Sequence, residues 1–181
     1  LKNMKNLFKR KSFVAIGIAI FLIGVFFLST TTRAEGDVDG VAQIGEAKYG
    51  TLQDAINAAG SEEATITLLT DVSGGGIFLG ANLGKNIIID FAGHTYNVVK
   101  DAVGSTGTKT QGFHLEKGNT ITLKNGTITS SAGSGVKMLI QKYCDLTLED
   151  MVLDGTNLDG SKKHYTLSNN NGTTLIAGNT T

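Results

Sequence analysis

The chain has 181 residues, with 16 basic and 16 acidic side chains, one cysteine, and no proline or tryptophan. A single cysteine excludes an intrachain disulfide, and with it the small stapled scaffolds common among exported proteins. Ten of the sixteen basic residues and all sixteen acidic residues follow Ala34, so this later part carries a net charge of −6 and no arginine. Such a charge opposes non-specific attraction to nucleic acid and to anionic lipid.

Residues 1–34 have the pattern of a secretory signal peptide. Five basic residues and no acidic residue precede position 12, an unbroken apolar run of 16 residues spans 13–28, and Thr32 and Ala34 supply small side chains at the cleavage site. The apolar run is shorter than the ~20 residues that cross a bilayer, which favours cleavage over an uncleaved membrane anchor. We therefore expect a secreted or cell-surface protein that meets the membrane only through this segment.

Residues 35–63 predict a strand-and-helix cap. A short strand pair is expected at 41–49. Thr51 and Asp54 then have the spacing of a capping box, in which the carboxylate reaches back to the start of a helix that ends at Gly60. Its apolar face would comprise Leu52, Ala55, Ile56 and Ala59. A helix of roughly nine residues is not stable alone, so we expect it to cover the open end of the structure that follows.

Residues 64–181 contain a repeat built from two apolar-x-apolar triplets. In each copy the two triplets lie eight residues apart, and successive copies begin 25 and then 27 residues later. The copies are 113–115 with 121–123, 138–140 with 146–148, and 165–167 with 173–175. A period of this size is typical of a solenoid, in which each repeat buries its apolar face only against its neighbours.

The repeat predicts an all-β fold, a right-handed parallel β-helix with three short strands per turn. An earlier coil can be assigned to 77–79 and 87–89, and third strands to the segments around Tyr96, Ile128 and Leu153. The alternative is an antiparallel sandwich, but the Asn-Gly turn signals at 125–126 and 171–172 stand where corners between coils would lie.

Equivalent side chains should stack in ladders, because neighbouring strands lie ~4.8 Å apart. The expected ladders are Phe113, Met138 and Tyr165; Leu115, Ile140 and Leu167; and Leu123, Leu148 and Leu175.

Two further features lie in the connections between strands. The segment from Lys100 to Gln111 is an insertion at one corner, and insertions in solenoids often carry binding sites. Cys144 lies in a short link between two strands. We expect it to be buried or half-buried rather than reactive, because no His or Arg stands near it in the sequence.

Three segments resemble a known family. Residues 41–59, 66–72 and 87–96 are similar to the opening of large secreted and surface proteins of Gram-positive gut bacteria, which belong to the pectate-lyase-like β-helix superfamily. The resemblance covers about residues 41–181 and implies the fold. It does not imply one activity, because the superfamily includes lyases, glycosidases, adhesins and inert stalks.

The catalytic residues that this resemblance would imply are not present in the family's form. Its lyases use clustered acidic Ca²⁺ ligands and a cationic base, commonly Arg, and no Arg follows residue 34. Its glycosidases use adjacent acidic pairs and a Gly-His-Gly segment. Here the acidic pair is 149–150, and residues 93–95 read Gly-His-Thr. Asp90, Lys124 and Glu149 take corresponding places in successive coils, which predicts a charge ladder rather than an acid/base pair.

Metal-binding patterns are weak. Residues 35–46 have the spacing of an EF-hand loop, but no helix precedes them and a strand follows, so we interpret them as a solvated linker. Residues 154–160 fit a corner with an Asx-turn better than a cation loop. The histidines have no metal spacing: His94 is expected in a turn, and His114 and His164 at outward positions of strands. We predict no catalytic, cofactor-binding or metal-ligating residue.

These observations favour a non-enzymatic adhesin, stalk or glycan-contacting module whose partners are glycans or host and cell-surface components, not nucleic acid. The alternative is a fragment of a polysaccharide lyase or glycoside hydrolase whose active coils lie downstream. Residues 176–181 contain no closing helix or capping strand, so we expect the coils of 64–181 to continue in a longer protein. A stop codon directly after Thr181 would contradict that expectation.

Overall fold

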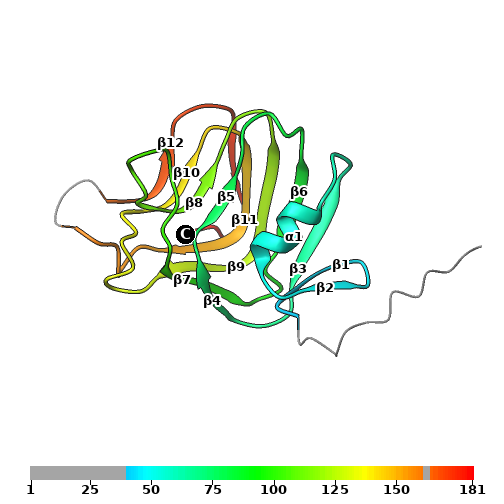
Figure 1. Cartoon of the computed structure of the whole chain (residues 1–181), viewed down its shortest axis with the longest axis horizontal. Helices are drawn as coiled ribbons and strands as arrows, with labels where there is room; N and C mark the ends of the chain where they lie inside the picture. Colours follow the sequence, from blue (N-terminus) through cyan, green and yellow to red (C-terminus); the bar gives the residue numbers. More distant parts are fainter. Residues whose placement is uncertain (1–39, 161–163) are drawn as a thin grey trace, which may run out of the picture. The chain divides into compact units, whose positions relative to one another are not determined.

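The computed structural model describes residues 40–160 and 164–181, which form a parallel β-solenoid of about four turns with one short helix. The predicted β-helix with a short N-terminal capping helix is confirmed. Figure 1 shows the coils stacked on one another, with α1 beside β1, β2 and β3. The predicted signal segment and residues 35–39 of the EF-hand-like segment lie outside the described residues. No helix among the described residues has the length and apolar character needed to cross a bilayer.

One sheet, sheet B, forms the first wall of the solenoid. Its four strands pair in parallel, each with the equivalent strand of the next coil. In order across the sheet they are β5 (Ile77–Leu79), β8 (Gln111–Leu115), β10 (Met138–Lys142) and β12 (Tyr165–Asn169).

The other sheet, sheet A, supplies the second and third walls. The second wall contains, in order, β2 (Ala47–Tyr49), β1 (Ala42–Ile44), β3 (Ala64–Leu68), β6 (Asn86–Asp90), the first halves of β9 (Thr120–Ser130) and β11 (Asp145–Asp154), and β13 (Thr174–Ala177). The third wall contains β4 (Val72–Gly75), β7 (Thr95–Lys100) and the second halves of β9 and β11. Asn125 and Asp150 stand where β9 and β11 bend between the walls, and both have left-handed φ, 59° and 51°.

The core is a stack of aliphatic and aromatic side chains from all walls. The first coil lies where the sequence placed it, because Ile77 pairs with Phe113, Leu79 with Leu115, and Ile89 with Leu123. Residues that alternate along these strands are buried and exposed in turn, as expected when one face of each strand packs inside. Tyr96, Ile128 and Leu153 also fall in register on the third wall, as predicted.

All three expected ladders are wrong in part, the first two for the same reason. Ile140, not Met138, lies opposite Phe113, and Lys142, not Ile140, lies opposite Leu115. The reason is the corner between β10 and β11, residues 143–144, which is shorter than the corner 116–119 between β8 and β9. A shift of two residues leaves every side chain on the same face, so the apolar pattern could not reveal it.

The third ladder is correct for Leu123 and Leu148 but not for its last member. Ile176 lies opposite Leu148, while Leu175 pairs with Thr147 and is 58% exposed. This one-residue shift does change the face. It arises because the corner 170–173 before β13 is again longer than 143–144.

Helix α1 (Leu52–Ala58) closes one end of the core and begins at the predicted N-cap. The Thr51 hydroxyl oxygen accepts a hydrogen bond from the Asp54 backbone N–H (3.0 Å), and the Thr51 hydroxyl donates to the Asp54 carboxylate (2.7 Å). The carboxylate therefore meets the hydroxyl and not the backbone N–H of Thr51. At the other end, Lys85 Nζ donates to the carbonyls of Ile56, Asn57 and Ala59, which have no partner within the helix. The predicted apolar face (Leu52, Ala55, Ile56 and Ala59) is buried.

The cap also covers two strand edges at this end. The antiparallel hairpin of β1 and β2 pairs with β3 through Ala42 and Gln43. On the first wall, the Gln53 side chain replaces a strand: its amide oxygen accepts from Phe78 N–H (2.8 Å), and its amide nitrogen donates to the Phe78 carbonyl (3.0 Å). A bare strand edge is a template for pairing with another chain, so this amide protects the edge of β5.

Replacing Gln53 with alanine should lower the free energy of unfolding by about 1–2 kcal/mol, because two hydrogen bonds of ~1 kcal/mol each are lost. It should also promote association through the bare β5 edge. Urea denaturation and sedimentation velocity measure the two effects. Asn57→Ala is the matched control, since Asn57 lies one helix turn from Gln53, its side chain accepts from the Gln53 amide, and its backbone carbonyl accepts from Lys85. Equal behaviour of the two variants would show that Gln53 does not protect the edge.

Candidate functional site

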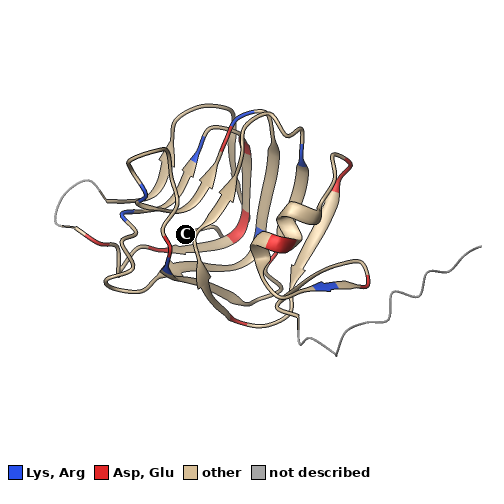
Figure 2. Cartoon of the chain, in the orientation of Figure 1, with Lys and Arg blue, Asp and Glu red and all other residues tan. Residues whose placement is uncertain are grey.

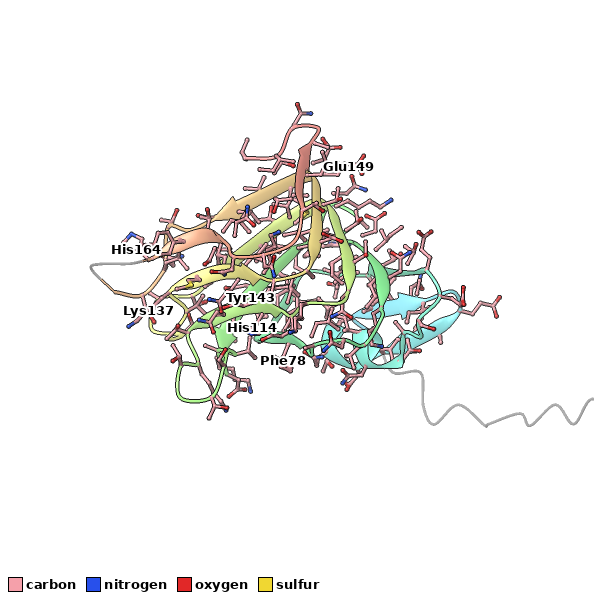
Figure 3. All side chains as sticks on the ribbon, turned by 90° about the horizontal axis from the view of Figure 1, so that it is seen from above. Phe78, His114, Lys137, Tyr143, Glu149 and His164 are labelled. Carbon is pink, nitrogen blue, oxygen red and sulfur yellow. The ribbon has the colours of Figure 1, made fainter. Side chains whose placement is uncertain are left out.

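The outer face of sheet B carries a ladder of side chains that crosses all four strands. Phe78, His114, Gln141 and Ser168 are in register from β5 to β12, and each lies between inward-facing neighbours of its own strand. Alternate residues of a strand share a face, so Glu116 and Tyr143 follow His114 and Gln141 on the same side. Figure 3 shows Phe78, His114 and Tyr143 one after another on one side of the molecule. We call these six residues the sheet B face.

His114 is the centre of the sheet B face. Its ring stacks on Phe78 with centroids 5.6 Å apart and an interplanar angle of 14°, and lies 5.8 Å from the Tyr143 ring. Its Nε2 is 2.7 Å from Glu116 Oε1. The predicted outward direction of His114 is right for the strand. However, the side chain is fully buried beneath its neighbours. The sequence pattern could not show this, because the covering rings come from other coils.

The two ring nitrogens of His114 are both closed to solvent. Nε2 faces the Glu116 carboxylate, which accepts its proton in a hydrogen bond, and Nδ1 is buried without a partner. A general base must reach the proton that it abstracts, and in this arrangement neighbouring side chains cover both ring nitrogens of His114. The His114 ring packs against the rings of Phe78 and Tyr143. The result is a rigid aromatic surface, with Phe78 44% exposed.

The insertion predicted at Lys100–Gln111 forms a rim beside this surface. It starts as β7 ends and returns through an antiparallel bridge between Val103 and Gln111, with Gly76 N–H donating to the Asp101 carbonyl (3.2 Å). A hollow of about 370 Å³ lies between this loop and the Phe78 ring. It is lined by Phe78, Asp101, Ala102, Val103, Gly104 and Lys109. The loop thus adds a polar and charged wall to the aromatic face.

A larger hollow, of about 450 Å³, runs along the corner between the first and second walls. Its polar groups are satisfied within the protein. The Asn119 amide donates to the carbonyls of Gly80 and Glu116 (both 2.9 Å) and accepts from Lys85 N–H (3.1 Å). Asp145, whose pKa is lowered mainly by its hydrogen bond from Thr173 N–H, faces the same corner. Since these groups are used by the fold, the corner is a weaker candidate than the sheet B face.

Cys144 lies in this corner and is 2% exposed. Burial raises the pKa of its thiol to about 11. The expectation of a buried, unreactive cysteine is confirmed, because a protonated thiol is a poor nucleophile.

The structure brings together the charged residues that the sequence singled out, but it leaves the three histidines on separate segments. Asp90, Lys124 and Glu149 are in register as predicted, and Lys124 Nζ lies 3.5 Å from Asp90 Oδ2. His94 follows a turn, with Nδ1 3.3 Å from Asp71 Oδ1, and His164 is exposed just before β12. Asp154 Oδ1 accepts from Thr156 N–H (3.0 Å), which confirms the Asx-turn.

Basic and acidic residues are interspersed over the part of the chain that the structure describes, as the view of Figure 2 shows. Within the described part of the chain, no three His, Cys, Asp or Glu side chains gather closely enough to hold a metal ion. The sheet B face itself offers the aromatic rings of Phe78 and Tyr143, the polar groups of Gln141 and Ser168, and the Glu116 carboxylate bonded to His114.

No known protein family matches the chain, and neither a characterised protein nor a solved structure is significantly similar to it.

Proposed function

We propose that this chain is an exported β-helix of the pectate-lyase-like type, displayed at a cell surface, whose sheet B face contacts glycans as part of an adhesin or stalk. The signal-peptide pattern and the family resemblance support export and display. The observation that carries the proposal is the sheet B face. Binding sites for small organic groups combine aromatic surface with a few fixed polar groups, and this face combines Phe78 and Tyr143 with Gln141 and Ser168.

The direction of the ladder suits an elongated ligand. Strands follow one another at ~4.8 Å across the sheet, so Phe78, His114, Gln141 and Ser168 form a row perpendicular to the strands. A linear glycan lying along this row would meet a new side chain at each coil. The buried His114 and its bond to Glu116 hold the aromatic rings in place before binding, which reduces the entropy lost on association.

Phe78→Ala and Tyr143→Ala should each weaken glycan binding about tenfold or more, because aromatic anchors commonly contribute over 1 kcal/mol. The measurement is a glycan array with residues 35–181, followed by titration calorimetry on the best ligand. Leu83→Ala is the control, since Leu83 is 50% exposed but lies in the corner after β5. Absence of any glycan ligand, or equal affinity of all three variants, would contradict the proposal.

The rival proposal is that the chain belongs to a polysaccharide lyase or glycoside hydrolase. It predicts release of unsaturated or reducing oligosaccharides from pectin-like polymers by the same protein. Both ring nitrogens of His114 are covered by neighbouring side chains, which argues against catalysis by this histidine on the sheet B face. Product release that survives Phe78→Ala and Tyr143→Ala would favour this rival and place the activity elsewhere.

A further inference from the structure

The third wall ends differently from the other two at the capped end of the solenoid. The edge of β3 is covered by β1, and the edge of β5 by the Gln53 amide. β4 pairs with β7 on one side, and within residues 40–160 and 164–181 no strand pairs with its other side. A strand edge of this kind presents unpaired backbone N–H and C=O groups to a further chain.

A hollow of about 400 Å³ lies along this free edge, between β4 and the start of α1. Its lining includes the buried side chains of Leu52, Ile77 and Tyr96. Tyr96 Oη donates to the Gly75 carbonyl (2.8 Å), and burial raises its pKa to about 12, so that it stays a donor. The hollow therefore combines an apolar floor with an open strand edge.

The sequence of β4 keeps this space empty of side chains. Ser73 is followed by three glycines, 74–76, and all four residues line the hollow. A β carbon at Gly74 would lie 2.7 Å from Tyr96 Oη, and one at Gly76 would lie 2.9 Å from the Asp101 carbonyl oxygen. The glycines at 74 and 76 therefore make room for Tyr96 and Asp101 of this chain, and the run 74–76 leaves this part of β4 without side chains along the hollow.

The charged side chains that line the hollow are acidic. Asp71 and Asp101 line it, and neither Lys nor Arg does. The Asp71 side chain is 75% exposed, and the hydrogen bond from Thr95 N–H holds the pKa of its carboxyl below the usual range. Asp71, whose Oδ1 also lies 3.3 Å from His94 Nδ1, and the exposed Asp101 thus place two acidic side chains along the hollow.

We propose that the free edge of β4 binds an extended peptide of a partner protein by strand addition. Backbone hydrogen bonds to β4 supply affinity, one apolar side chain enters the hollow, and basic side chains lie beside Asp71 and Asp101. The chain's own residues 35–39 do not suit the edge, because Glu35, Asp37 and Asp39 would meet the two carboxylates. This site is separate from the sheet B face and does not depend on glycan binding.

The test uses residues 35–181, since Glu35–Thr181 is one compact unit. The probes are two end-blocked peptides of about nine residues, a common strand length, with alternating Thr and Val; one has Lys at both ends and the other Glu. The Lys peptide should bind, slow the amide exchange of residues 72–75, and bind more weakly as salt increases. The Glu peptide should bind at least tenfold more weakly.

The variant Asp71→Asn/Asp101→Asn should weaken binding of the Lys peptide roughly three- to tenfold, because exposed charge pairs contribute up to ~1 kcal/mol each. Asn keeps the acceptor for Thr95 N–H and tolerates the left-handed φ of 50° at position 101. Glu116→Gln, on the sheet B face, is the control and should not change binding. Equal binding of both peptides, no protection of 72–75, or an unchanged double variant would overturn the proposal. So would a dimer that protects 72–75 without peptide, which would make a second copy the occupant.

Discussion

Replacing Phe113 with alanine is expected to lower the free energy of unfolding by about 3–5 kcal/mol, among the largest effects of any single side chain in this protein. Phe113 is fully buried at the centre of the second coil, and its ring meets the Tyr96 ring edge-on with centroids 5.4 Å apart. Truncation removes this contact and leaves a cavity that the flanking coils cannot fill, because their strands are held in register on both sides. Urea denaturation with a two-state fit measures the loss.

A double-mutant cycle turns the same variant into a test of the register. Phe113 lies opposite Ile140 in the structure, whereas the repeat alone placed it opposite Met138. Phe113→Ala combined with Ile140→Val should show a coupling of at least ~0.5 kcal/mol, because the two side chains touch in one layer. Phe113→Ala combined with Met138→Ala should be additive within about the same amount. Coupling of Phe113 to Met138 instead of Ile140 would support the pairing that the repeat predicts and contradict the register of the structure.

Replacing Lys142 with methionine is expected to lower the free energy of unfolding by about 2–4 kcal/mol, because buried acceptors that lose their donor cost ~1–3 kcal/mol each when water cannot replace it. Lys142 is fully buried on an inward position of β10. Its ammonium group donates to the carbonyls of Asn171 (2.7 Å), Thr173 (2.8 Å), Gly172 (2.9 Å) and Cys144 (3.2 Å). It thereby joins the corner before β13 to the preceding coil.

Methionine conserves most of the volume of Lys142, so a loss of stability reports the missing donor rather than a cavity. Lys137→Met is the control, because Lys137 is exposed just before the same strand. Hydrogen exchange should show that opening of residues 171–177 accounts for most of the change in K142M. A stability of K142M equal to that of K137M would show that water replaces the ammonium group without cost.

The sheet B face illustrates how far a site can be predicted from this sequence. The repeat placed Phe78 and His114 at the middle of their triplets, and alternation within each strand indicated the outward face. Its next triplets ended at Ile140 and Leu167, so Gln141 and Ser168 were not predicted beside His114. Nothing in the sequence showed that the rings of Phe78 and Tyr143 would cover His114. Nor did it show that His114 Nε2 would form a hydrogen bond with the Glu116 carboxylate. Those contacts join coils and depend on the register between strands, which the two-residue ambiguity at β10 left open.

The hollow beside β4 could not be predicted from the sequence, for a related reason. The glycines 74–76 carry no apolar pattern, and a strand edge becomes free or covered only when the other chain segments have taken their places. Gln53 shows the same dependence. A polar residue on a short helix gave no sign that its amide would complete the edge of β5, 25 positions further along the chain.

The sequence by itself determined the class of fold, the position of the capping helix, and the inward face of most strands. These follow from local periodicity and from the N-cap chemistry of Thr51, each encoded within a few consecutive residues. The tertiary structure alone decided the register between coils, the burial of His114, the four-carbonyl site of Lys142 and the free edge of β4. Each depends on corner lengths and on contacts between residues some 25 to 30 positions apart, and apolar periodicity does not change when a strand slips by two.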